Sequence, residues 1–369
     1  MNEELKKSIA KLDRELLDVF ARRLELEKQL KGNDPERERR LLLNFREKAS
    51  PELSEYAGVL YSTISDLGRS VRRREVSCDT VFTDRIHKAL DKTGEFFPKD
   101  ARVACCALPG AYAQIAADKL FQLADITYVN DFNGVFQAVA KGLCRYGILP
   151  IENSTSGTVD AVCDLMKDHD FYIVRSYRLR VQHSLLLPPG VKLADVKEIF
   201  SHEQAFKQCG KFLATMPQAK HSNCSSTALA ARTVAESGRK DVAAIASSVC
   251  ADIYGLTEYN GKIQDSDFNY TRFICIAREP EIYPGANRIS IMATLPHRAG
   301  ALYRLLSRFS VLGLNLTKLE SRPIPGEEFE YMFYFDFDAS VADPQVLNLL
   351  SELQHDDGKF VFLGNYQEL

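Results

Sequence analysis

Apolar residues return every three or four positions along the first thirty residues of the chain. The repeating positions are Leu5, Ile9, Leu12, Leu16, Val19, Leu26 and Leu30. This spacing predicts a long helix with a heptad seam, and the seam is interrupted by one polar residue, Arg23. A second helix is expected to begin at Pro35 with Asp34 as its N-cap, and a third to cover residues 50–71. Because three helices of unequal length do not enclose a complete core, we expect this region to pair with a second copy of the chain.

From residue 102 onward, short apolar runs alternate with amphipathic segments. Strands are expected at 102–107, 126–129, 145–151, 172–187, 198–202, 241–247 and 271–277. Helices are expected at 111–121, 132–142, 158–169, 203–215 and 225–237. This alternation predicts a mostly parallel sheet with both faces covered. The chain leaves the first sheet near residue 178 and returns near residue 270, which predicts two lobes with a cleft between them.

A linker that contains Pro and Gly, residues 278–287, precedes a further change of pattern. The last part of the chain has the order strand, helix, strand, strand, helix, strand, which is a ferredoxin-like βαββαβ unit. Residues 77–100 are expected to be a connector. The chain is therefore predicted to contain a helical domain at 1–78, a two-lobed α/β domain at 101–278 and a ferredoxin-like domain at 288–366.

Composition removes several classes of function. The 369 residues carry a net charge of -3 with acids and bases mixed, so no nucleic-acid partner is expected. The chain has no run of about 18 apolar residues, so no membrane span is predicted. The nine cysteines lack metal-ligand spacing and no glycine-rich nucleotide motif occurs, so we expect neither a metal nor a cofactor. Unpaired thiols, and a charged N-terminal helix in place of an apolar signal segment, lead us to expect a cytoplasmic protein.

Three clusters of polar residues lie at the ends of predicted strands in the α/β region. The first is residues 152–158, where a strand is expected to run into a helix. Free N–H groups at a helix start favour an anion, although hydroxyl residues also cap helices. The second is residues 201–204, whose adjacent serine and histidine lack a nucleophile elbow and so do not predict a serine hydrolase. The third is the pair Thr271-Arg272, and the three clusters together predict one polar cleft.

Arg23 is a separate candidate. An unpaired guanidinium in an apolar seam is costly, so Arg23 needs a partner. That partner is either a carboxylate such as Glu38 or an anionic ligand, with Lys6, Arg37 and Arg39 nearby.

Four segments carry a resemblance to a known family: ILPIENSTSGTV, SHEQAFKQC, NYTRF and KLESRPIPGEEFEYMFYFDF. In this order they resemble prephenate dehydratase followed by an ACT regulatory domain, over residues about 102–366. The N-terminal helices, with the seam arginine and the run RER, resemble the all-helical chorismate mutase fused to this enzyme in bifunctional proteins. The resemblance implies a helical mutase-type domain, a two-lobed α/β domain like that of periplasmic binding proteins, and a ferredoxin-like ACT domain.

The resemblance implies a dehydratase that uses no cofactor and no metal. Prephenate loses carbon dioxide and its ring hydroxyl together, so the enzyme holds the carboxylates and protonates the departing hydroxyl. Thr271 is implied near that hydroxyl, with Glu152 as the acid or an orienting group and His202 as a weaker acid candidate. Arg272 is implied to bind a carboxylate or to brace its strand. The other implied cleft donors are Asn153, Ser154, Ser156, Thr158, Ser201 and Gln204.

The resemblance also implies a second activity, the rearrangement of chorismate to prephenate by the helical domain. Such a site binds two carboxylates and stabilises charge on the breaking ether oxygen. The implied residues are Lys6, Arg23, Arg37, Glu38 and Arg72. Two of them depart from the family, because Lys6 stands where arginine is usual and Arg72 where glutamine or glutamate is usual. The alternative is a degenerate domain that only pairs the chain with a second copy.

In the last domain, the resemblance implies a phenylalanine site between two ACT domains that gives feedback inhibition. The implied residues are Gly300, Ala301, Leu302, Asn315, Leu316, Glu320, Ser321 and Arg322. The expected partners are prephenate, chorismate, L-phenylalanine and further copies of the chain, in a homodimer or larger homo-oligomer. Three alternatives stay open: arogenate as the substrate, an ACT-type unit that pairs without a ligand, and a non-catalytic amino-acid sensor.

Overall fold

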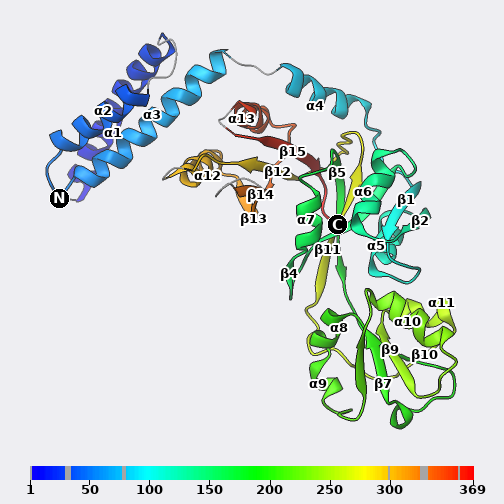
Figure 1. Cartoon of the computed structure of the whole chain (residues 1–369). Helices are drawn as coiled ribbons and strands as arrows, with labels where there is room; N and C mark the ends of the chain where they lie inside the picture. The colour runs from blue at the N-terminus through cyan, green and yellow to red at the C-terminus, as the bar shows by residue number, and fades with distance from the viewer. Residues whose placement is uncertain (1, 30–34, 77–79, 298–299, 325–330, 356–357) are drawn as a thin grey trace. The chain divides into compact units, whose positions relative to one another are not determined.

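The computed structural model describes residues 2–29, 35–76, 80–297, 300–324, 331–355 and 358–369 (Figure 1). Its contacts divide the chain into two units. The first unit contains residues 1–86, 292–335 and 341–361, and the second contains residues 87–291, 336–340 and 362–369. Residues of the last predicted domain occur in both units, and the three predicted domain boundaries stay a prediction.

Three helices open the first unit, as the apolar spacing predicts. They are α1 (Asn2–Lys28), α2 (Pro35–Lys48) and α3 (Ser54–Val76). Pro35 stands at the first position of α2, where its missing N–H removes no helical hydrogen bond, and its predicted cap Asp34 lies outside the described residues. The seam of α1 is exposed, with Leu12 62% and Leu26 64% accessible, so in one copy of the chain this apolar stripe faces solvent.

The predicted connector contains a helix that the apolar pattern left unassigned, α4 (Thr80–Lys92). Phe82, Ile86 and Ala89 are buried, and their spacing places them on one face of this helix. The period is the same as in the earlier helices, but the segment is too short for the pattern to stand out.

The first lobe of the second unit is built on a six-stranded sheet in the order β2-β1-β3-β11-β5, with β4 paired to β3. Its strands are β1 (Asp100–Cys106), β2 (Leu123–Val129), β3 (Tyr146–Asn153), β4 (Gly157–Thr158), β5 (Tyr172–Arg180) and β11 (Tyr270–Ala277). Its helices are α5 (Tyr112–Leu120), α6 (Phe132–Ala140) and α7 (Asp160–Leu165). β1 pairs in parallel with β2 and β3, whereas β11 runs antiparallel to β3 and β5.

The second lobe has a five-stranded sheet in the order β10-β6-β9-β7-β8. Its strands are β6 (Ser184–Leu187), β7 (Glu198–Ser201), β8 (Lys220–Asn223), β9 (Val242–Ala246) and β10 (Thr257–Glu258). Its helices are η1 (Leu193–Asp195), α8 (Glu203–Gln208), α9 (Gly210–Leu213), α10 (Thr227–Glu236) and α11 (Val249–Tyr254). The chain crosses into this lobe between β5 and β6 and returns at β11, so the predicted two-lobed arrangement is confirmed (Figure 1). The prediction of a mostly parallel sheet is wrong, because the strands that connect the lobes pair antiparallel with their neighbours.

The last part of the chain forms a four-stranded sheet in the order β13-β14-β12-β15. Its elements follow the predicted βαββαβ order: β12 (Arg288–Thr294), α12 (Ala301–Val311), β13 (Asn315–Pro323), β14 (Tyr331–Asp338), α13 (Pro344–Gln354) and β15 (Phe360–Tyr366). β13 is the edge strand, and its exposed and half-buried residues alternate. In the parts of the chain that the structure describes, no helix has the length and apolar character needed to cross a membrane.

Candidate active site

The strand β11 presents two neighbouring polar residues to opposite faces of the first sheet. Thr271 and Arg272 are adjacent, so their side chains point to opposite sides. Thr271 lies opposite Asn153 of β3, and Arg272 lies opposite Glu152. One face therefore carries Thr271 and Asn153, and the other carries Arg272 and Glu152.

The backbone fixes the orientation of the Asn153 amide. Its Oδ1 accepts the backbone N–H groups of Thr155 at 3.0 Å and of Ser156 at 3.1 Å. A backbone N–H only donates, so the carbonyl side of Asn153 has to face these two groups. The NH2 side then donates to Thr271 Oγ1 at 2.9 Å and to Asn269 Oδ1 at 2.9 Å.

Four side chains close a ring of hydrogen bonds that we call the amide ring. Asn269 Nδ2 donates to Gln208 Oε1 at 2.9 Å, and Gln208 Nε2 donates to Thr155 Oγ1 at 2.9 Å. The Thr155 hydroxyl donates to Asn153 Oδ1 at 2.6 Å, which returns to the starting amide. Asn153 ends β3 in the first lobe and Thr155 lies just after it. Gln208 ends α8 in the second lobe, and Asn269 lies just before β11. The amide ring therefore joins the two lobes at the point where the chain crosses between them.

The residues of the amide ring are neutral, and its polar atoms satisfy one another. Asn269 is 2% and Thr271 8% exposed. Thr271 Oγ1 accepts from Asn153, and in the described part of the chain its own proton has no acceptor. The arrangement offers one oriented hydroxyl, which suits a ligand that carries a hydrogen-bond acceptor.

The opposite face of β11 holds a buried ion cluster. The Arg272 guanidinium, 2% exposed, lies 2.8 Å from Glu152 and 2.5 Å from Asp336 of β14, and 3.7 Å from Glu368. Its charge is balanced by carboxylates of the protein, so the brace alternative fits and the carboxylate-binding role for Arg272 is not supported. Glu152 faces Arg272 rather than Thr271, so the geometry does not support Glu152 as the acid either.

The second predicted cluster forms the joint between β7 and α8. Ser201 is fully buried and donates to the carbonyl oxygen of Ile245 at 2.7 Å. His202 is exposed, and its Nδ1 accepts the backbone N–H of Gln204 at 3.2 Å, which caps α8. The structure gives Ser201 and His202 these structural contacts and brings neither them nor Gln204 into the amide ring. Gln208, one helical turn after Gln204, is the residue that enters it, and the sequence prediction missed it.

The first cluster forms a hairpin before the helix that was expected to follow it. After Asn153 the chain turns back, and Gly157 and Thr158 pair with β3 as β4. The helix that follows, α7, has six residues and begins with Asp160, two residues later than expected. The anion site at its start stays a prediction. The Ser154 hydroxyl donates to the carbonyl oxygen of Phe268 and accepts the N–H of Tyr270. Ser156 donates to Asn153 Oδ1 at 3.0 Å. These hydroxyls hold the hairpin together. Thr155 belongs to the same predicted cluster but not to the implied cleft donors, and it is the one in the amide ring.

Two further residues in this region were missed. His183 Nε2 lies 2.8 Å from Gln208 Oε1, and its Nδ1 lies 2.9 Å from the Tyr112 hydroxyl. Burial lowers the pKa of His183 and raises the pKa of Tyr112 well above its ordinary value. His183 lies in an apolar extended run, where no spacing or motif marks it.

The predicted mutase residues are spread along the helices of one chain. Lys6 is exposed and pairs with Glu3 at 3.3 Å. Arg23 pairs with Glu27 of its own helix at 2.8 Å and donates to the carbonyl of Ile64 on α3 at 3.3 Å. The partner found is therefore Glu27, which the sequence prediction did not name. Arg37 is exposed on α2, while the side chains of Glu38 and Arg72 lie outside the part of the chain that the structure describes.

The predicted phenylalanine residues lie at two places in the last sheet. Residues 300–302 begin α12, with Gly300 in a left-handed conformation at φ 76°, and the others lie along the edge strand β13.

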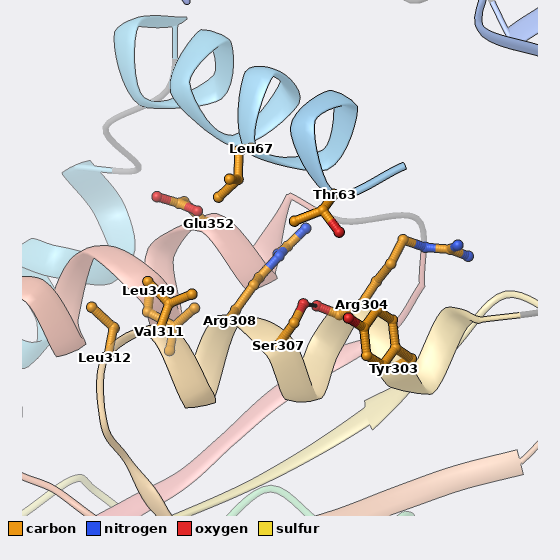
Figure 2. A pocket seen from close by; sticks show the side chains of 10 residues that line it. All are labelled: Thr63, Leu67, Tyr303, Arg304, Ser307, Arg308, Val311, Leu312, Leu349 and Glu352. Atoms are coloured by element: carbon orange, nitrogen blue, oxygen red, sulfur yellow. Dashed lines mark hydrogen bonds between the residues drawn. The ribbon is translucent and has the colours of Figure 1, made fainter. Parts of the chain in front are cut away.

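A pocket beside α12 is lined by Thr63, Leu67, Tyr303, Arg304, Ser307, Arg308, Val311, Leu312, Leu349 and Glu352. Figure 2 shows Thr63 and Leu67 of α3 on the side of this pocket that faces α12. The pocket contains no predicted site residue and no member of the amide ring.

No group of three or more His, Cys, Asp or Glu side chains among the described residues is placed to hold a metal ion.

The two-lobed α/β domain gathers neutral hydrogen-bond donors where its lobes join. This arrangement is typical of the class of α/β domains that bind small molecules. A family model for prephenate dehydratase matches residues 103–281. Arogenate dehydratase/prephenate dehydratase 1 of Arabidopsis thaliana is 39% identical over 282 residues, which cover 72% of this chain and 71% of that protein. The chain belongs to the prephenate dehydratase family.

Two solved structures share the fold. Prephenate dehydratase from Arthrobacter aurescens in complex with L-Phe is 30% identical with a TM-score of 0.65, covering 72% of this chain and 89% of that chain. GqqA, described as a novel type of quorum quenching acylase, is 28% identical with a TM-score of 0.66, covering 73% of this chain and 98% of that chain. Because one fold carries both names, the reaction has to be argued from the site.

The expected cytoplasmic location is contradicted by the same relatives. The Arabidopsis arogenate dehydratase/prephenate dehydratases 1 and 2 are both named as chloroplastic. The absence of disulfide spacing in the sequence separates reducing from oxidising compartments, and it does not separate one reducing compartment from another.

Proposed function

We propose that the chain is a dehydratase of phenylalanine synthesis that converts prephenate to phenylpyruvate, with arogenate as the alternative substrate. The observation that carries the proposal is the Thr271 hydroxyl, which accepts from Asn153 and has its proton directed to neither amide. The family membership and the Arabidopsis relative, named for both substrates, support the same reaction.

The proposed reaction consumes one proton. The ring carboxylate leaves as carbon dioxide, its bonding electrons move into the ring, and the C–O bond to the ring hydroxyl breaks. The departing hydroxide takes a proton and leaves as water, so the products are phenylpyruvate, carbon dioxide and water. A threonine hydroxyl is a weak acid, so Thr271 donates a hydrogen bond that stabilises charge on the departing oxygen rather than supplying the proton outright.

The test is a pair of substitutions at one position. Thr271→Ala is expected to lower kcat for prephenate by about 100-fold or more, because it removes the oriented donor. Thr271→Ser keeps a hydroxyl and is expected to stay within about tenfold of wild type. Phenylpyruvate is followed by its absorbance, and arogenate is assayed in parallel for phenylalanine. Full activity in Thr271→Ala would contradict the assignment.

We also propose that the helices retain chorismate mutase activity in a homodimer. Lys6 and Arg23 stand about 25 Å apart along α1, since an α-helix rises about 1.5 Å per residue. One site that uses both therefore needs Lys6 from one copy and Arg23 from another, and the exposed α1 seam supports such pairing. Purified protein is tested for chorismate loss above the uncatalysed rate. Loss at only that rate, with prephenate still converted, supports a domain kept for pairing alone.

The third proposal is feedback inhibition by L-phenylalanine through an ACT-type C-terminal domain. Its support is the βαββαβ order and the edge position of β13, which is open to pairing with a second copy. Gly300 has φ 76° and any side chain there is strained, so Ser321→Ala is the cleaner test. Unchanged inhibition in this variant would contradict the predicted site. Phenylalanine binding by a wild type that converts neither substrate would favour the amino-acid sensor.

A further inference from the structure

His183 touches the amide ring from outside its four members. It lies between β5 and β6, in the segment that crosses into the second lobe, and is 9% exposed. Its Nε2 is 2.8 Å from Gln208 Oε1, the atom that also accepts from Asn269. The question is whether Gln208 presents its oxygen, so that Nε2 donates, or its NH2, so that Nε2 accepts.

Backbone N–H groups fix the orientation of one amide, and that amide fixes the orientations of the next two. The N–H groups of Thr155 and Ser156 turn the NH2 of Asn153 toward Asn269, which therefore presents Oδ1 to it. Asn269 then turns its own NH2 toward Gln208, which has to present Oε1. An amide oxygen only accepts, so Nε2 of His183 carries a proton and donates it to Gln208.

The Tyr112 hydroxyl lies on the opposite side of the imidazole, 2.9 Å from Nδ1. Burial lowers the pKa of His183, which favours one proton on the ring. The titratable group that contacts it is the Tyr112 hydroxyl of α5, and burial raises the pKa of this hydroxyl, so it brings no charge. The Tyr112 hydroxyl also lies 2.6 Å from the carbonyl oxygen of Gln182, and its one proton serves one acceptor at a time.

The two lobes anchor the amide ring differently. Asn153 is held by backbone N–H groups of the first lobe, but Gln208 comes from α8 of the second lobe and receives its donors from side chains alone. Without His183, one of the two donors to Gln208 Oε1 is lost, and the amide is held only by Asn269 and Thr155. A rotated Gln208 would set its NH2 against the NH2 of Asn269, so the amide ring would no longer be closed between the two lobes.

We propose that His183 is a positioning residue of the dehydratase, whose Nε2–H holds Gln208 and so keeps the amide ring closed between the two lobes beside Thr271. This inference rests on the proposed function. His183 need not touch the substrate, because it acts through Gln208 and the amide ring.

The test uses two amides that imitate different ring nitrogens. His183→Gln places an N–H near the position of Nε2, His183→Asn places one near Nδ1, and His183→Leu has neither. We expect kcat for prephenate within about threefold of wild type in His183→Gln and at least about tenfold lower in the other two, with KM changed less than twofold. Thermal unfolding of all three confirms that each is folded. Equal kcat in the Gln and Asn variants, or full activity in His183→Leu, would overturn the inference.

A second measurement does not depend on turnover. In protein labelled with nitrogen-15 at histidine, the signal that disappears in His183→Gln identifies His183, and its shifts report which nitrogen is protonated. We expect the Nε2–H form. The Nδ1–H form in an active wild type overturns the inference alone, whereas a wild type that converts neither prephenate nor arogenate overturns the proposed function and this role with it.

Discussion

At the scale of single residues, the direction of one amide decides what Thr271 can do. If Asn153 presented its oxygen to Thr271, the threonine would donate to it and its proton would be used inside the protein. Backbone N–H groups forbid that orientation, so the hydroxyl keeps its proton for a ligand. Nothing in the run NSTSG predicts this, because the orientation depends on a hairpin that precedes the expected helix.

The charge state of His183 predicts a pH-dependent stability. The ordinary pKa of histidine is about 6.5, and burial lowers it in the native protein. As the pH falls below about 6.5, the unfolded chain binds a proton at this position before the native protein does, so unfolding becomes more favourable. Wild type is therefore expected to lose unfolding free energy more steeply than His183→Gln from about pH 6.5 down through the lower native pKa. Urea unfolding curves between pH 7.5 and 5 measure this, and parallel slopes would contradict it.

At the scale of elements, β11 serves two structures at once. Through Thr271 it faces the amide ring, and through Arg272 it is tied to a carboxylate of β14. Ser290 of β12 donates to the same Asp336 at 2.5 Å and contacts the Tyr366 hydroxyl of β15 at 2.7 Å. The motif TRF thus places Thr271 at the candidate site on one face of β11. On the other face it places Arg272 in an ion cluster with Asp336, which we call the buried anchor.

The anchor predicts a large stability cost at one arginine and a small cost at another. Arg272→Gln leaves Asp336, which is fully buried, without its cation, and is expected to lower the free energy of unfolding by about 3 to 5 kcal/mol. Arg178→Gln breaks a 2.8 Å pair with Glu368 on a side chain that is 56% exposed, and is expected to cost less than about 1 kcal/mol. Denaturant unfolding compares them, and similar costs would argue against the anchor.

Helix α8 predicts a similar contrast within one turn. Gln208→Glu replaces the NH2 that donates to Thr155 with an oxygen that cannot, and is expected to lower kcat by at least about tenfold. Gln204→Glu makes the same change four residues earlier, outside the amide ring. Its loss of kcat is expected to be about tenfold smaller than the loss in Gln208→Glu. Steady-state kinetics on prephenate separate the two, and a larger loss at Gln204 would show that the substrate approaches from the other turn of the helix.

At the scale of the whole molecule, the exposed seam of α1 predicts self-association. Leu12→Glu places a charge in the apolar stripe and is expected to shift the protein toward monomer in light scattering after size exclusion. Lys11→Glu is the control, because Lys11 is 80% exposed beside the seam. Equal masses for both variants and wild type would show that other surfaces hold the copies together, or that the chain is a monomer.

Periodic features of the fold could be predicted from the sequence, and unpatterned contacts could not. The helices α1 to α3, the two lobes and the βαββαβ order follow from apolar spacing, which local sequence carries. Strand direction does not, so the antiparallel pairing of β11 was missed. In the candidate site, Asn153 and Thr271 were singled out from the sequence, whereas Gln208 and His183 are brought in by the crossing between lobes, which no local spacing encodes.

The buried anchor also limits how the enzyme can be dissected. A fragment that ends at residue 281, the limit of the family match, keeps Thr271 and Arg272 but loses Asp336 and Glu368. The Arg272 guanidinium then lies in the interior without the carboxylates of Asp336 and Glu368, and only Glu152 balances its charge. A minimal catalytic fragment is therefore expected to be soluble only after redesign, with an apolar residue in place of Arg272, and the boundary of the motif is not the boundary of the folding unit.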